Sequence, residues 1–222
     1  MKEGRNYIYL FRHGQTTYNR DRRFTGIHDP SLTSLGKKQA QLIAKKLKNK
    51  KFQLSYHTSL KRSKQTLAIV LKNHPECKEI KEDNRIIERN YGALNGTTHQ
   101  KFIEKMGKKL YKLEVEGDFL TELSKNQRKK IETFLGSEEY EAIHRGFNVP
   151  PPQGESFADV EKRVKSFINF LIPIIKERRI NIAISAHGNS IRLFRKIMEK
   201  SSIKKTCSWT IPYDKVFIYS IS

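Results

Sequence analysis

The chain has 222 residues, of which 36% are hydrophobic and 30% charged, and this fits one α/β domain that buries its own core. No stretch approaches the ~20 apolar residues of a transmembrane helix, and the first residues are too polar for a secretory signal. The two cysteines, Cys77 and Cys207, fit free thiols in a reducing, cytoplasmic compartment. The 44 Lys and Arg against 23 Asp and Glu give a formal net charge of +21. Because the lysines are scattered over many predicted helices, we interpret this charge as a solvated surface and expect no nucleic-acid or membrane partner.

Hydrophobic spacing and turn residues predict alternating strands and helices. In chain order we expect a strand over 6–12, a helix over 32–49 with Thr33 as its N-cap, a strand over 52–58, a helix over 60–72, a short strand near Ile80, a mostly helical region over 97–143, a helix over 155–177 that Pro173 should kink, a strand over 180–187, a helix over 190–200 and an edge strand over 215–221. Strand 180–187 is apolar on both faces, as a central parallel strand should be. The alternation predicts an α/β fold with a mainly parallel sheet and helices on both faces. We expect a single domain over 1–222 with a helical insert over about 100–143.

Two of the predicted strands end in the same way. The first ends in residues 12–14, RHG, and the central strand ends in residues 186–188, AHG. In parallel α/β sheets, ligands bind outside the carboxyl ends of the strands. If these strands are neighbours, His13 and His187 meet at the edge where ligands bind, and a pair of packed core histidines is a poor explanation for both.

His13 has the surroundings that a histidine nucleophile needs. The backbone beside Gly14 is close enough to hold Nδ1 in one tautomer, which leaves Nε2 free to attack. Arg12 cannot lose its proton and suits phosphate oxygens, and Arg62 in SLKRSKQT offers a second cation near a helix N-terminus. This combination predicts phosphoryl transfer, which depends on positioning and charge stabilisation. Glu88 in RIIERNYGALNG is a candidate acid for the leaving oxygen, although this segment alone fits a surface carboxylate on a turn equally well.

Five sequence blocks resemble the histidine phosphatase superfamily, and most of all its cofactor-dependent phosphoglycerate mutase branch. They are LFRHGQTTYN, RRFTGIHDPSLTSLG, SLKRSKQT, IIERNYGALNG and SAHGNSIR, in the order found in that family, and the likeness covers roughly 1–99 and 144–222. RHG alone is a weak signal, whereas FTGIHDPSLT and ERNYGALNG favour the mutase branch. The resemblance implies the three-layer fold of that family and a cytoplasmic enzyme of glycolysis. Such an enzyme interconverts 2- and 3-phosphoglycerate through a phosphohistidine and is primed by 2,3-bisphosphoglycerate.

The resemblance also implies roles for individual residues, without a metal ion. His13 would be phosphorylated, Glu88 would be the general acid and base, and Arg12, Arg62 and His187 would bind the transferring phosphoryl group. The implied substrate-binding residues are Thr16, Asn19, Thr25, Gly26, Arg89, Tyr91, His99, His144, Arg145, Gly188 and Asn189. The seven histidines show no HxxxH spacing and the two cysteines no CxxC spacing that would indicate a metal site.

Three positions depart from the mutase pattern. His99 stands where mutases of this branch typically have Lys, His144 stands where they have the first of two adjacent Arg, and Ile143 replaces a typical Trp. The insert is longer than usual, and PPPQGES runs into the next helix without the lid segment of longer mutases. Because His is mostly neutral above its usual pKa of ~6.5, we expect mutase activity to weaken relative to phosphatase activity between about pH 6 and 8.

Three functions follow from these residues. The first is the mutase, the second is a phosphatase of small phosphorylated metabolites that uses the same phosphohistidine with water as the acceptor, and the third is a basic binding module without activity. The set Arg12, His13, Arg62, Glu88 and His187 is intact, which argues against the binding module because a binder needs no placed acid. We favour the mutase over the phosphatase and expect a small phosphorylated substrate as partner. The physiological acceptor, the role of the insert and assembly into a homo-oligomer stay open.

Overall fold

A five-stranded sheet organises the chain, which the computed structural model describes over residues 5–114 and 123–222. The strands are β1 (Asn6–Arg12), β2 (Leu54–His57), β3 (Glu79–Glu82), β4 (Ile182–Ala186) and β5 (Val216–Ile221), in the order β3-β2-β4-β1-β5. The pairs β2–β3, β2–β4 and β1–β4 are parallel, and only β5 runs antiparallel to its neighbour in the described sheet. The predicted mainly parallel sheet, the central β4 and the edge strand β5 are therefore confirmed.

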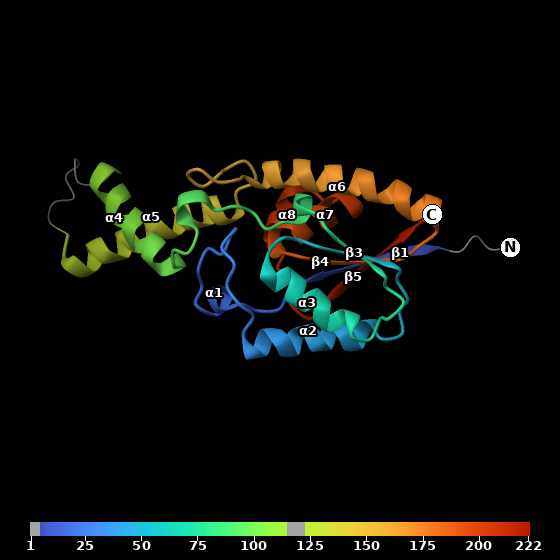
Figure 1. Ribbon diagram of the computed structural model, residues 1–222. Coiled ribbons are helices and arrows are strands. Elements are labelled where there is room, and N and C mark those ends of the chain that lie inside the picture. Colours follow the sequence, from blue (N-terminus) through green and yellow to red (C-terminus); the bar gives the residue numbers. More distant parts are fainter. Residues whose placement is uncertain (1–4, 115–122) are drawn as a thin grey trace.

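Helices cover both faces of this sheet and complete three layers (Figure 1). On one face lie α2 (Ser34–Leu47) and α3 (Lys61–Leu71), and on the other lie α6 (Phe157–Arg178), α7 (Gly188–Met198) and α8 (Ile203–Ser208). A hydrophobic core lies on each side of the sheet, and successive residues of β1 point alternately into one core and the other. Ile8 and Leu10 pack toward α6, whereas Tyr9 and Phe11 pack toward α2. This alternation follows from the two-residue period of a strand and fixes which side of the sheet each residue serves.

The carboxyl ends of β1 and β4 lie side by side, as the sequence predicted. Arg12 pairs with Ala186 in the register, and the backbone N–H of His13 donates to the carbonyl oxygen of Ala186 at 3.0 Å. The strands therefore bring His13 and His187 to the same edge of the sheet, where α1 (Thr17–Arg20) and α7 begin.

The predicted insert contains a helical hairpin that extends from one end of the sheet (Figure 1). It consists of α4 (His99–Glu114) and α5 (Lys125–Arg145), and residues 115–122 between them lie outside the described residues. The helices approach closely at Gly107 and Gly136, where an added Cβ would collide with a backbone carbonyl of the other helix. His99 at the start of α4 and His144 in the last turn of α5 lie at the base of this hairpin, next to the rest of the domain.

Helix α6 runs through Pro173 to Arg178, close to the predicted bounds of 155–177, and the kink expected at Pro173 stays a prediction. Both Pro173 and Asn169, whose carbonyl loses its helical partner, are exposed, so water can satisfy that carbonyl. The short elements α1, α8, η1 (Asn84–Ile86) and η2 (Gly92–Leu94) were not predicted, because three to six residues show no periodicity. Within residues 5–114 and 123–222, no helix is both long and apolar enough to cross a bilayer.

Candidate active site

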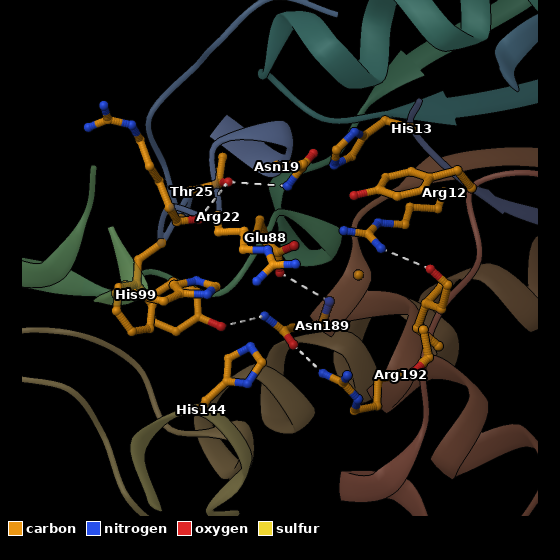
Figure 2. A pocket seen from close by; sticks show the side chains of 18 of the residues that line it. Arg12, His13, Asn19, Arg22, Thr25, Glu88, His99, His144, Asn189 and Arg192 are labelled. Atoms are coloured by element: carbon orange, nitrogen blue, oxygen red, sulfur yellow. Dashed lines mark hydrogen bonds between the residues drawn. The ribbon is translucent and has the colours of Figure 1, made fainter. Parts of the chain in front are cut away.

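A cavity of about 240 Å³ opens at the edge of the sheet where β1 and β4 end (Figure 2). Among its lining residues are six arginines and one carboxylate: Arg12, Arg22, Arg23, Arg62, Arg145 and Arg192 against Glu88. So strong an excess of positive charge in a concave site attracts anions and suits a phosphorylated ligand. The predicted residues His13, Asn19, Thr25, Gly26, Tyr91, His99, His144, Arg145, Gly188 and Asn189 also line it.

His13 is held in the tautomer that a nucleophile requires. Its side chain is buried, and its Nδ1 lies 2.7 Å from the carbonyl oxygen of Gly14. A carbonyl can only accept, so Nδ1 carries the proton, and Nε2 keeps its lone pair. Arg62 Nε–H donates to this Nε2 at 3.3 Å. Burial, followed by the charges of Arg62 and Arg12, lowers the pKa of His13 well below its usual value, which keeps the ring neutral at physiological pH.

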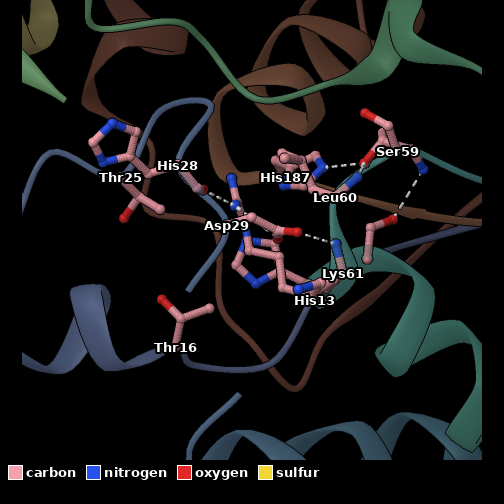
Figure 3. A network of polar contacts seen from close by, with 12 residues as sticks. His13, Thr16, Thr25, His28, Asp29, Ser59, Leu60, Lys61 and His187 are labelled. Carbon is pink, nitrogen blue, oxygen red and sulfur yellow. Dashed lines mark hydrogen bonds and ion pairs between the residues drawn. The ribbon is translucent and has the colours of Figure 1, made fainter. Parts of the chain in front are cut away.

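Arg62 is fixed by the loop that follows Phe24. Its Nη1 donates to the carbonyl oxygen of His28 at 2.6 Å, and its Nη2 donates to that of Gly26 at 2.8 Å. In the same network the backbone N–H of Lys61 donates to Asp29 at 3.0 Å, which ties the loop to the start of α3 (Figure 3). Burial lowers the pKa of Arg62 to about 10, so the guanidinium stays charged at neutral pH. The loop therefore presents a rigid cation beside His13 Nε2.

Arg12 is the second cation next to His13. Its Nη1 donates to the carbonyl oxygen of Ile211 at 2.8 Å, and its guanidinium lies 4.0 Å from the centre of the Tyr213 ring. Its Nε is buried and has no hydrogen-bond partner among the described residues. An unpaired, buried N–H of a charged group is costly, and it is relieved when an anion binds beside it.

Glu88 lies in the loop between η1 and η2, and its side chain is buried at the cavity. Its Oε1 accepts from the backbone N–H of Arg89 at 2.8 Å and from that of Asn189 at 3.1 Å. Its Oε2 has no hydrogen-bond partner in the described part of the chain. One oxygen thus orients the carboxyl group, and the other is available to exchange a proton with a ligand. The surface-carboxylate interpretation of Glu88 is wrong.

His187 lies behind His13 rather than on the cavity surface. The two ring centroids are 5.0 Å apart, and His187 Nε2 lies 2.8 Å from Thr58 Oγ1. The ring is fully buried and is not among the residues that line the cavity, while its Nδ1 lacks a partner among the described residues. Burial, reinforced by Arg62, lowers its pKa well below the usual value. In this arrangement His187 supports His13 from behind.

Two of the expected substrate-binding residues serve the backbone instead. Thr16 is buried and caps α1: its Oγ1 accepts from the backbone N–H of Asn19 at 3.2 Å. Arg89 is buried and donates to three carbonyl oxygens, those of Ile143, Val149 and Glu155. Neither residue lines the cavity, so the structure gives both an indirect role in shaping it.

Arg192 belongs to the site although the sequence did not single it out. It is buried on α7 and donates to Asn189 Oδ1 and, at 2.8 Å, to the carbonyl oxygen of Trp209. The contact turns the Asn189 amide so that its Nδ2 donates to the hydroxyl of Tyr91 at 3.3 Å. The only signal was its position in the block SAHGNSIR, one helical turn after Asn189. Arg22, Arg23, Ile211 and Tyr213 also line the cavity and were not predicted as site residues, because turns and loops bring them there.

His99 and His144 face each other across the base of the hairpin. Their ring centroids are 5.7 Å apart, and Tyr140 packs against both, with its hydroxyl 3.1 Å from His99 Nδ1. Burial, and then the charge of Arg22, lowers the pKa of His99 to about 4; burial, and then the charge of Arg145, lowers that of His144 to about 3. The expectation that these residues lose their charge between pH 6 and 8 is therefore wrong for the free protein, because both are already neutral.

These low pKa values predict acid lability. A histidine whose folded pKa lies below its unfolded value of ~6.5 takes up its proton mainly on unfolding, so its stabilising effect is lost as pH falls from about 6.5 toward the folded pKa. His13, His99, His144 and His187 all shift in this direction. We expect the melting temperature to fall steadily from pH 7 to pH 5 at constant ionic strength, and a His99→Leu, His144→Leu variant to show a shallower fall. A melting temperature that is constant or rises toward pH 5 would contradict this.

The sequence matches the family model described as histidine phosphatase superfamily (branch 1) over residues 8–119 and 120–221. It is 27% identical over 214 residues to the 2,3-bisphosphoglycerate-dependent phosphoglycerate mutase of Pseudoalteromonas atlantica, which covers 96% of this chain and 92% of that protein. It is 34% identical over 212 residues to the enzyme of the same name from Buchnera aphidicola subsp. Schizaphis graminum, with 93% of this chain and 90% of that protein covered.

The same fold occurs in a solved structure with a different name. The alpha-ribazole phosphatase from Shigella flexneri superimposes with a TM-score of 0.69 over 96% of this chain and 89% of that one, at 20% identity. At this identity the likeness concerns the fold alone. The family match covers nearly all of the sequence, and the residues of its motifs meet at one cavity. The chain therefore belongs to the histidine phosphatase superfamily.

Proposed function

We propose that this protein transfers the phosphoryl group of a small phosphomonoester to His13 Nε2 and from there to an acceptor. The observation that carries the proposal is the deprotonated Nε2 of His13, which lies against Arg62 in a cavity also lined by Arg12 and Glu88. In the first step the P–Nε2 bond forms, the ester P–O bond breaks, and Glu88 gives a proton to the leaving oxygen. In the second step the acceptor oxygen forms a new P–O bond, the P–Nε2 bond breaks, and Glu88 takes the proton from the acceptor.

Charge in this reaction is balanced by the protein's own side chains. Arg12 and Arg62 neutralise the phosphoryl oxygens, and the Nδ1–H of His13 keeps its bond to Gly14 while the ring carries the phosphoryl group. The proposal therefore includes no metal ion. Fixed donors of this kind act without reorganising at the moment of reaction, which is why we assign them the main stabilising role.

The first candidate reaction is the interconversion of 2- and 3-phosphoglycerate, with 2,3-bisphosphoglycerate as the primer that phosphorylates His13. Its support is sequence similarity: relatives named for this reaction match more than 90% of the chain. A soluble, cytoplasmic enzyme of glycolysis would follow from this assignment.

A phosphatase of small phosphorylated metabolites is the second candidate, and the cavity itself supports it. His99 and His144 are neutral, so that side of the cavity attracts the carboxylate of a phosphoglycerate only weakly. A mutase must also retain its bisphosphorylated intermediate until that intermediate has reoriented in the site and can phosphorylate the histidine again. Weaker retention of the intermediate favours water as the acceptor.

One assay separates the two reactions. Interconversion of 2- and 3-phosphoglycerate is measured with and without added 2,3-bisphosphoglycerate, beside release of free phosphate. Primer-dependent interconversion that exceeds phosphate release identifies the mutase, whereas phosphate release without interconversion identifies the phosphatase.

Both candidates share an expected response to inhibitors. Activity should survive EDTA, because arginines supply the charge, and should fail with vanadate, which takes the geometry of a phosphoryl group in transfer. Loss of activity in EDTA that magnesium or manganese restores would contradict the proposed chemistry.

A further inference from the structure

One side of the cavity is built from aromatic rings. Phe24, Tyr91, His99 and His144 line it and Tyr140 packs behind them; we call these five residues the aromatic wall. Neighbouring ring centroids lie 4.7 Å apart for Phe24 and His99, 4.9 Å for Phe24 and Tyr91, and 4.9 Å for Tyr140 and His144. Figure 2 shows His99 and His144 facing the cavity on the side away from His13. The part of a substrate that leaves with the ester oxygen therefore meets this wall.

The aromatic wall carries no charge at neutral pH. Its two histidines stay unprotonated because they are partly buried and because Arg22, Arg89, Arg145 and Arg192 surround them. The wall thus presents neutral ring surface where a carboxylate would need a cation.

The arginines nearest the wall are anchored elsewhere. Arg145 Nη1 donates to the carbonyl oxygens of Cys207 and Trp209, both at 3.3 Å, and Arg192 donates to Trp209 and Asn189. Arg22 lies exposed at the mouth of the cavity, and its side chain has no hydrogen bond or ion pair within the described residues. A carboxylate placed against the aromatic wall would lose its water beside two arginines, Arg145 and Arg192, that already donate to other parts of the protein.

We propose that the outer half of the cavity binds an uncharged planar ring, so that the preferred substrates are phosphate monoesters of small aromatic or heteroaromatic alcohols. The proposal rests on the proposed phosphoryl transfer to His13, and of the two candidate reactions it favours the phosphatase over the mutase. The cavity of about 240 Å³ is smaller than the ~300–1,000 Å³ of sites for drug-sized ligands, which suits a substrate with about one ring beyond the phosphate. Each well-oriented contact between aromatic rings is worth roughly 2- to 12-fold in affinity.

The test compares three esters of primary alcohols, so that their leaving groups are similar. These are 2-phenylethyl phosphate, 2-cyclohexylethyl phosphate, which has the same size but no flat ring, and 3-phosphoglycerate, which is anionic. We expect kcat/KM for the phenyl ester to exceed that for the cyclohexyl ester by about 2- to 12-fold, which is the value of one ring contact. We also expect kcat/KM for the phenyl ester to exceed that for 3-phosphoglycerate. Equal values for the first two esters, or a preference for 3-phosphoglycerate, would overturn the proposal.

Two variants test whether the aromatic wall causes the preference for the phenyl ester. His144→Leu removes a ring without adding charge, and it should bring the ratio of the phenyl to the cyclohexyl ester close to one. Phe134→Leu is the matched control: Phe134 lies on the same helix, is 63% exposed and does not line the cavity, so the ratio should stay at the wild-type value. A ratio that is unchanged in His144→Leu, with a wild-type melting temperature, would also overturn the proposal. If that variant does not fold, the comparison of esters on the wild-type protein still decides.

Phosphorylation of His13 distinguishes failure of this inference from failure of the proposed function. If 3-phosphoglycerate labels His13 and the phenyl ester does not, the inference is wrong and the phosphoryl transfer stands. If no ester labels His13, the proposed function is wrong, and the inference falls with it.

Discussion

Replacing His13 with alanine is expected to abolish formation of the phosphoenzyme and to lower turnover by on the order of 10⁴- to 10⁶-fold. The reason is that Nε2 of His13 is the unprotonated nitrogen in the cavity that the Gly14 carbonyl orients and Arg62 contacts. Loss of a nucleophile removes the whole covalent route, and only binding and charge stabilisation are left. The measurement is incubation with a labelled phosphate donor, followed by a search for an acid-labile, base-stable adduct on the peptide that contains residue 13.

His28→Ala is a suitable control for this experiment. Arg62 binds the backbone carbonyl of His28 and not its ring, so the loop keeps its contact after the substitution. This variant should label like the wild-type protein. A His13→Ala protein that still labels and turns over would show that another residue receives the phosphoryl group.

Replacing Glu88 with glutamine is expected to slow alkyl phosphates by ~10²–10⁴-fold, the usual worth of general acid–base catalysis. The Oε1 of glutamine can still accept the two backbone N–H groups of Arg89 and Asn189, so the geometry is kept and only the proton is lost. Donors with a good leaving group, such as p-nitrophenyl phosphate, need no proton and should phosphorylate His13 at a rate close to the wild-type rate.

The measurement is the rate of phosphoenzyme formation for both kinds of donor. Glu82→Gln, at an exposed position at the end of β3, serves as the control and should affect neither donor. If Glu88→Gln slows the two donors equally, the carboxyl group positions the substrate and does not supply the proton.

Much of the fold could be predicted because it depends on local patterns. Residues 182–186 of β4 are all buried, which matches the apolar strand seen in the sequence, and Thr33 caps α2 by accepting from the backbone N–H of Gly36 as predicted. The placement of His13 and His187 also followed, since parallel strands end at the same edge and each His follows the last residue of its strand.

The sequence also showed the chemical type of each site residue, but it did not show which groups that residue contacts in the folded protein. Arg12, Arg62 and Arg89 look alike in the sequence. Only packing separates the first two, which line the cavity, from Arg89, whose donors are taken by three backbone carbonyls. Likewise, Arg192 enters the site because α7 turns it toward Asn189 and because the segment around Trp209 folds back over it.

The charge of His99 and His144 shows most directly what only the folded chain decides. Their usual pKa of ~6.5 predicts titration near neutral pH, and that value describes an imidazole in water. In the fold both rings are partly buried against Tyr140 and surrounded by arginines, which lowers their pKa values to about 4 and about 3. Residue type and spacing were enough for the strands, the longer helices and the two histidines at the edge of the sheet. Burial and neighbouring charges depend on contacts between residues far apart in sequence, so they had to come from the tertiary structure.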